Sequence, residues 1–86
     1  MSWEHVSFVI RSNTREALPR ELEKPKTPTI LAHELHTGLP NVSRSLRELK
    51  ARGLIQSVTP GAKTGKIFVA TDEGRAVMLK IREMRQ

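Results

Sequence analysis

The feature that most constrains the fold of this chain is a short turn, Thr37-Gly38-Leu39, between two stretches with helical periodicity. The first stretch, about 28–36, follows Thr27-Pro28, a capping hydroxyl and then a proline suited to the first helical position. The second, about 40–52, carries its apolar side chains on one face: Val42, Leu46 and Leu49. A glycine in the turn favours the left-handed conformation that ends a helix. Together these features predict a helix-turn-helix at about 28–52.

The residues after this unit predict a hairpin and a last helix. Leu54 to Thr59 and Lys66 to Ala70 are rich in apolar and β-branched residues, and glycines flank the loop between them. Thr71 is suited to cap a helix at about 72–85. We therefore expect a mainly α fold with a small β-hairpin wing, about 54–70, and a three-helix core followed by a C-terminal helix.

The residues before the unit predict two short helices that meet at Ser12-Asn13, where Asn13 resembles a cap. Pro19 removes a backbone hydrogen bond, so we expect a kink or break near Arg15 to Leu18. An 86-residue chain with 37% hydrophobic residues is expected to form one domain, 1–86.

Cysteine is absent, which excludes disulfides, thiolate metal sites and cysteine nucleophiles. No apolar run approaches the ~20 residues of a membrane span, and the first residues do not resemble a secretory signal. These observations predict a soluble cytoplasmic protein with no membrane partner.

Positive charge is concentrated in one part of the chain. Residues 41–66 contain six Lys or Arg residues and a single acidic residue, Glu48, so they carry +5 of the net charge of +6. A local excess of this kind attracts a polyanion. The alternative is a solvated basic face that only aids solubility.

Two segments carry a resemblance to a known family. "TPTILAHELHTGLPNVSRSLRELKARGLI" followed by "GKIFVATDEGRAV" resembles the winged helix-turn-helix regulators of the MarR and ArsR superfamily, especially its short archaeal members. Within it, "VSRSLRELKARGLI" resembles a recognition helix entering the first wing strand, and "ATDEG" resembles the cap after the wing. The resemblance covers roughly residues 27–77 and implies a DNA-binding regulator of transcription. It gives no support for metal sensing, because the sensing cysteines are absent.

The outward face of the second helix supplies the candidate contacts to DNA. With the apolar stripe turned inward, Arg44 points almost directly outward and Arg47 and Asn41 lie in the outward half. Arginine reads guanine and asparagine reads adenine in the major groove, so these three are candidates for base contact. Ser43, Ser45 and Lys50 are candidates for contact with the backbone. A helix that simply exposes its charges to water is the alternative.

The predicted hairpin loop, about 60–66, carries two lysines and no acidic residue. We expect Lys63, Thr64 and Lys66 to contact phosphates or a minor groove, which would make binding strongly salt-dependent. An ordinary polar hairpin tip is the alternative.

Other kinds of site find little support in the sequence. His33, His36 and His5 lack a carboxylate placed to complete a metal site. Gly61 and Gly65 are hairpin glycines, and nothing resembles a nucleophile elbow. We therefore expect no cofactor, no metal and no enzymatic activity.

Apolar residues on the terminal helices exceed what one small core is expected to bury: Trp3, Phe8, Met78 and Leu79. They suggest a homodimer packed through these helices, which would place two recognition helices ~34 Å apart on a palindromic site. Completion of the monomer core is the alternative.

The leading hypothesis is a sequence-specific transcriptional regulator that binds double-stranded DNA. Two alternatives remain open: a winged-helix adaptor that contacts other proteins of a transcription complex, and a nonspecific binder of nucleic acid, including RNA.

Overall fold

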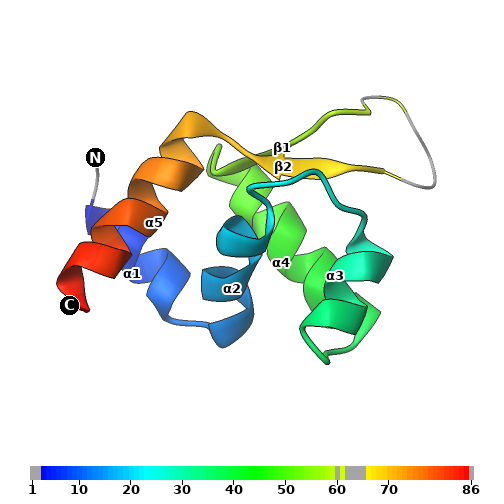
Figure 1. Cartoon of the computed structure of the whole chain (residues 1–86), viewed down its shortest axis with the longest axis horizontal. Helices are drawn as coiled ribbons and strands as arrows, with labels where there is room; N and C mark the ends of the chain where they lie inside the picture. Colours follow the sequence, from blue (N-terminus) through cyan, green and yellow to red (C-terminus); the bar gives the residue numbers. More distant parts are fainter. Residues whose placement is uncertain (1–2, 60, 62–65, 86) are drawn as a thin grey trace.

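The computed structural model describes residues 3–59, 61 and 66–85. These residues form helices and one two-stranded antiparallel sheet, in the order α1 (Trp3–Ile10), α2 (Asn13–Glu21), α3 (Pro28–Glu34), α4 (Leu39–Ala51), β1 (Ile55–Ser57), β2 (Phe68–Ala70) and α5 (Asp72–Met84) (Figure 1). This order confirms the predicted α+β class with a hairpin before the last helix. No helix within the described residues is long and apolar enough to span a membrane.

The second helix differs from its prediction in two ways. The cap is Ser12, whose Oγ accepts a hydrogen bond from the backbone N–H of Arg15 at 3.3 Å, and not Asn13. The expected break is also wrong, because α2 continues through Pro19. The proline side chain is fully buried, and burial of its apolar surface offsets the one backbone hydrogen bond that it cannot donate.

The turn between α3 and α4 is built differently from its prediction. The N–H of His36 bonds to the carbonyl of His33, and the N–H of Thr37 bonds to that of Ala32, which is the Schellman pattern that closes a helix. The residue in left-handed conformation is His36, with φ 52°, and not Gly38. Gly38 is extended, with φ −70°, and is the N-cap of α4. Glycine is also favourable at an N-cap. The glycine therefore predicted the position of the turn correctly, but not which residue adopts the left-handed conformation.

The end of α4 agrees with its prediction. Gly53 has φ 74°, and the N–H groups of Gly53 and Leu54 bond to the carbonyls of Lys50 and Leu49. The next residue therefore leaves the helix directly into the hairpin. In that hairpin Ile55 pairs with Ala70 and Ser57 with Phe68, so its regular part is shorter than predicted.

The segment between α2 and α3 holds the hairpin against the helices, and so does the cap of the last helix. The backbone of Lys26 exchanges two hydrogen bonds with that of Phe68, at 3.0 and 2.8 Å, on the free edge of β2. Thr71 caps α5 by accepting from the N–H of Gly74, and its hydroxyl donates to the carbonyl of Gly53 at 2.6 Å. A side chain at Gly74 would collide with the carbonyl oxygen of Leu54, 2.0 Å from an ideal Cβ. The cap therefore joins α5 to the end of α4.

One apolar core receives side chains from each helix and from both strands. It contains Val6, Val9, Leu18, Leu22, Leu31, Val42, Leu46, Leu49, Leu54, Ile55, Phe68, Ala70, Val77 and Ile81. The predicted stripe of α4 is buried as expected. Because the inner face of α4 is anchored in this core, its opposite face is turned outward.

Candidate nucleic-acid interface

The outward face of α4 carries three exposed cations, Arg44, Arg47 and Lys50. Among the residues that the structure describes, none of the three lies within 4.0 Å of a carboxylate oxygen. Glu48, the one acidic residue of the helix, is paired with Arg15 of α2 at 3.8 Å. Their charges are therefore left for solvent or for a ligand.

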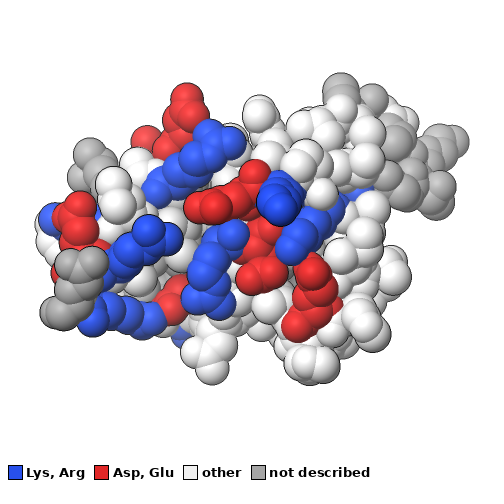
Figure 2. All heavy atoms as spheres, viewed as in Figure 1, with Lys and Arg blue, Asp and Glu red and all other residues white. Residues whose placement is uncertain are grey.

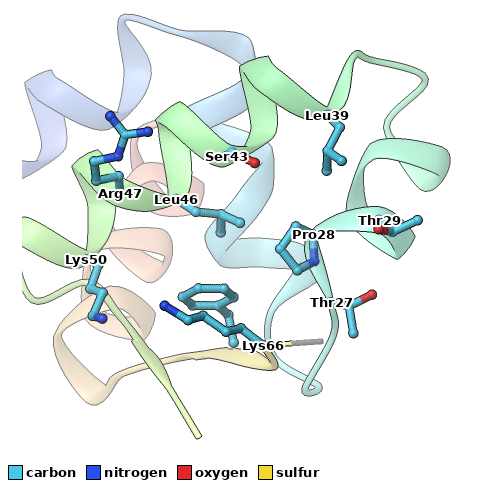
Figure 3. A pocket seen from close by; sticks show the side chains of 10 residues that line it. Thr27, Pro28, Thr29, Leu39, Ser43, Leu46, Arg47, Lys50 and Lys66 are labelled. Carbon is cyan, nitrogen blue, oxygen red and sulfur yellow. The ribbon is translucent and has the colours of Figure 1, made fainter. Parts of the chain in front are cut away.

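A hollow of about 470 Å³ lies between α4, the start of α3 and β2 (Figure 3). Its lining consists of Thr27, Pro28, Thr29, Leu39, Ser43, Leu46, Arg47, Lys50, Lys66 and Phe68. Leu46 and Phe68 belong to the apolar core, so the hollow has an apolar floor. Figure 3 shows the amino groups of Lys50 and Lys66 at the same end of the hollow, whereas the guanidinium group of Arg47 points away from both. We call this set of lining residues the cationic hollow.

The cationic hollow brings together residues that lie far apart in the chain. Arg47 and Lys50 come from α4, whereas Lys66 precedes β2. The base of the hairpin holds Lys66 in place, because the N–H of Ile67 bonds to Oγ1 of Thr59 at 3.0 Å and the N–H of Val58 bonds to the carbonyl of Ile67 at 2.8 Å. The amino groups of Lys50 and Lys66, gathered at one end of a hollow that Arg47 also lines, have no carboxylate partners among the described residues and favour an anionic ligand.

The two serines predicted to contact phosphate lie in different environments. Ser45 is only 3% exposed, so it is removed from the set of candidate phosphate contacts. Its position three residues after Val42 and four before Leu49 places it on the apolar stripe. Ser43 is half-buried and lines the cationic hollow.

The amide of Asn41 is already occupied inside the protein. Its Nδ2 donates to the hydroxyls of Thr14 and Thr37, both at 3.0 Å. Its Oδ1 accepts a hydrogen bond from Nη2 of Arg44 at 2.9 Å. A direct adenine contact by Asn41 requires the same donors and acceptor, so the expected base-reading role is not supported by this geometry.

Two predicted residues of the loop, Lys63 and Thr64, lie outside the described residues. Lys66, at the end of the loop, is described and exposed.

Arg52 and Phe8 form an arrangement that sequence reasoning missed. The ring of Phe8 lies between two guanidinium groups, with the Cζ atoms of Arg15 and Arg52 at 4.1 and 3.9 Å from its centroid. Arg52 therefore belongs to the α1 side of the molecule, although the sequence counts it in the basic stretch 41–66. An aromatic residue in α1 and arginines elsewhere give no local signal of this stacking.

The residues expected at a dimer interface divide into two pairs. Phe8 and Met78 are partly buried and pack against the core of the monomer. Trp3 and Leu79 are 62% and 54% exposed. Only the second pair retains the exposure that the prediction requires.

The face seen in Figure 2 has a different electrostatic character, because acidic and basic side chains alternate over it. Outside the hollow, Lys26 lies between Glu34 and Glu21, with Nζ–Oε1 distances of 2.8 and 3.2 Å. The hydrogen bond to Glu34, supported by the one to Glu21, raises the pKa of Lys26 above its ordinary value. Arg85 likewise pairs with Glu16. This face offers no uniform positive field to a polyanion.

The histidines do not form a metal site in the described part of the chain, which contains no group of three or more His, Asp or Glu residues able to hold an ion. His33 and His36 are both exposed.

Comparison with known proteins identifies a fold relative. No protein-family model matches the chain, and no curated protein matches its sequence. Among solved structures, a double mutant of ZitR from Lactococcus lactis is similar, with a TM-score of 0.73, 22% sequence identity and coverage of 84% of this chain. This chain spans about half (51%) of the length of the ZitR chain. The likeness, together with the order of helices and hairpin, shows a winged helix-turn-helix fold.

Proposed function

We propose that this chain is a DNA-binding regulator of transcription in which α4 enters the major groove and the cationic hollow lies against the sugar-phosphate backbone. An α-helix fits the major groove of B-DNA, and the first half of the second helix of a helix-turn-helix meets the base edges. Arg44 lies in that half of α4. Arg47 follows one turn later, where it borders both the groove-facing surface and the hollow.

The observation that carries the proposal is the convergence of Lys50 and Lys66 on one hollow, which Arg47 also lines, without a carboxylate partner among the described residues. Phosphate contacts from Lys and Arg supply much of the affinity of proteins for DNA. The hydroxyl of Ser43 adds a donor, and the apolar floor formed by Leu46 and Phe68 suits the carbon atoms of deoxyribose. Lys63 and Thr64 would extend this contact along the loop.

We further propose that the regulator acts in the cytoplasm as a homodimer. Four exposed apolar side chains on α1 and α5 support this proposal: Trp3, Ile10, Leu79 and Met84. A two-fold pair of recognition helices would favour a palindromic site with half-sites about 34 Å apart.

The proposal is tested by selecting bound fragments from a random duplex pool and measuring affinity by fluorescence anisotropy. Arg47→Ala with Lys50→Ala removes two cations of the hollow, whereas Arg20→Ala with Lys24→Ala removes two exposed cations elsewhere and changes the net charge equally. We expect the first double variant to lose at least about tenfold in affinity and the second to lose less than about twofold.

The same experiment separates the two alternatives. Equal affinity for selected and random duplexes would favour a nonspecific nucleic-acid binder. Equal affinity of the two double variants, or no duplex binding by the wild type, would contradict the proposal and favour the adaptor function.

A further inference from the structure

The side chain of Asn41 lies where three parts of the molecule meet. It reaches Thr14 at the start of α2, Thr37 in the turn before α4, and Arg44 one turn further along its own helix. The orientation of its amide follows from chemistry. A guanidinium group has only donors, so the amide atom facing Arg44 is the oxygen, and the NH₂ group then faces the two threonine hydroxyls. All three hydrogen bonds, at 3.0, 3.0 and 2.9 Å, are consistent with this orientation.

We propose that Asn41 is a positioning residue for Arg44, and that Arg44 is the residue that reads a guanine. This inference rests on the function proposed above. To read adenine bidentately, Asn41 would present one N–H and its oxygen to the base edge. Both groups already have partners in the free protein. Asn41 would therefore lose hydrogen bonds on turning toward DNA, whereas it keeps them by holding Arg44.

The geometry leaves Arg44 well suited to guanine. Its side chain is exposed and lies beyond 4.0 Å of any carboxylate in the part of the chain that the structure describes. One N–H of its guanidinium bonds to Asn41, and the remaining donors suffice for a bidentate contact with O6 and N7. A long side chain that is already restrained loses less conformational entropy when it binds.

The hydroxyls of Thr14 and Thr37 anchor the Asn41 amide, and the amide in turn restrains Arg44. Thr14 is 27 residues away in sequence, and its hydroxyl ties the amide to α2 rather than only to α4. The hydroxyl of Thr37 holds the same amide from the turn before α4, so the amide keeps one anchor when the other is removed. The positioning of the guanine-reading side chain thus depends on the scaffold as well as on its own helix.

A double-mutant cycle tests the proposal with the full chain and the duplex selected from the random pool. The cycle uses the wild type, Asn41→Ala, Arg44→Ala and the double variant, with affinity measured by anisotropy on the selected duplex and on duplexes with each single base pair replaced. We expect Asn41→Ala to lower affinity about three- to tenfold, the effect of freeing one long side chain. We expect it to weaken preference at the same base pair that Arg44→Ala affects, and to lower affinity by less than about twofold when Arg44 is already alanine.

Thr14→Val provides a control for a merely structural role. It removes one anchor of the amide but leaves the bond between Asn41 and Arg44 in place. We expect a lower melting temperature and an affinity within about twofold of the wild type. If Thr14→Val lowers affinity as much as Asn41→Ala, the effect reports stability and the positioning role is overturned.

The remaining outcomes separate this inference from the proposed function. An equal loss from Asn41→Ala in both backgrounds means that Asn41 contacts DNA itself, and no loss in the wild-type background means that it positions nothing. Either result overturns the inference and leaves the proposed function intact. A wild-type chain that binds no duplex overturns the proposed function, and an Arg44→Ala variant that binds as the wild type removes the guanine contact on which the inference rests.

Discussion

The cationic hollow and the face shown in Figure 2 contain the same kinds of basic side chains in opposite electrostatic situations. Arg47, Lys50 and Lys66 line the hollow, and none of them has a carboxylate oxygen within 4.0 Å among the described residues. Outside the hollow, Lys26 and Arg85 are each paired with glutamate. Paired charges are neutralised inside the folded chain, whereas unpaired ones retain their field for a ligand. Net charge alone therefore does not locate a binding surface; the distribution of carboxylates does.

We expect the largest effect from reversing the charge of two residues of the hollow, which tests the contrast directly. Lys50→Glu with Lys66→Glu places two carboxylates where we expect phosphates, and we expect affinity for the selected duplex to fall by at least about a hundredfold at low salt. Arg20→Glu with Lys24→Glu makes the same change in net charge at exposed positions outside the hollow. We expect this control to lose less than about fivefold by anisotropy. Similar losses in both variants would show that net charge, and not the hollow, governs binding.

A second effect concerns salt dependence. Each phosphate contact contributes about −0.9 to the slope of log affinity against log salt on B-DNA. Lys50→Ala with Lys66→Ala should therefore make the slope shallower by about 1.8. The measurement is a salt titration of the wild type, of this variant and of the Arg20→Ala, Lys24→Ala control. A slope that stays the same in the hollow variant would mean that neither lysine contacts a phosphate.

The sequence was sufficient to predict the parts of this fold that depend on local signals. The caps at Thr27 and Thr71 form the expected bonds to the N–H groups of Ile30 and Gly74. The apolar stripe of α4 is buried as the spacing of Val42, Leu46 and Leu49 predicts. Such features depend on residues within one or two turns of each other, so the chain itself displays them.

The sequence was not sufficient where a distant partner or a competing local conformation decides the geometry. The contact of Asn41 with DNA stays a prediction, but its outward position on the helix did not indicate that Thr14 of α2 accepts a hydrogen bond from its amide. Arg52 was counted with the basic stretch, but the ring of Phe8 draws it toward α1. In the turn, the left-handed conformation was predicted for Gly38 but is adopted by His36. Neither the two long-range contacts nor the conformation of His36 is indicated by the periodicity or the composition of the sequence.

A third and smaller effect tests the paired face. Lys26→Met removes the ion pairs to Glu21 and Glu34 but keeps the backbone bonds to Phe68. We expect the free energy of unfolding to fall by less than about 1 kcal/mol, since pairs between partly exposed charges are screened by water. Affinity for the selected duplex should stay within about twofold. A tenfold loss of affinity would place Lys26 in the binding surface and remove the contrast between the two faces.

The smallest effect sharpens the contrast within the basic stretch itself. Arg47 and Arg52 are both exposed. Arg47 lies in α4, and Arg52 is the C-cap of the same helix. Arg52 stacks on Phe8 instead of lining the hollow. Arg52→Ala should therefore cost about 0.5 kcal/mol of stability, the loss of one cation–π contact near the surface, in chemical denaturation.

DNA binding should distinguish these two arginines although the sequence does not. We expect Arg52→Ala to bind the selected duplex within about twofold of the wild type, while Arg47→Ala, with the same change in charge, loses about three- to tenfold. Equal losses would mean that the basic stretch acts by its summed charge, whichever way its side chains turn. Unequal losses in this direction require that the fold, by turning Arg52 onto Phe8 and leaving Arg47 on the outward face of α4, decides which cations meet the duplex.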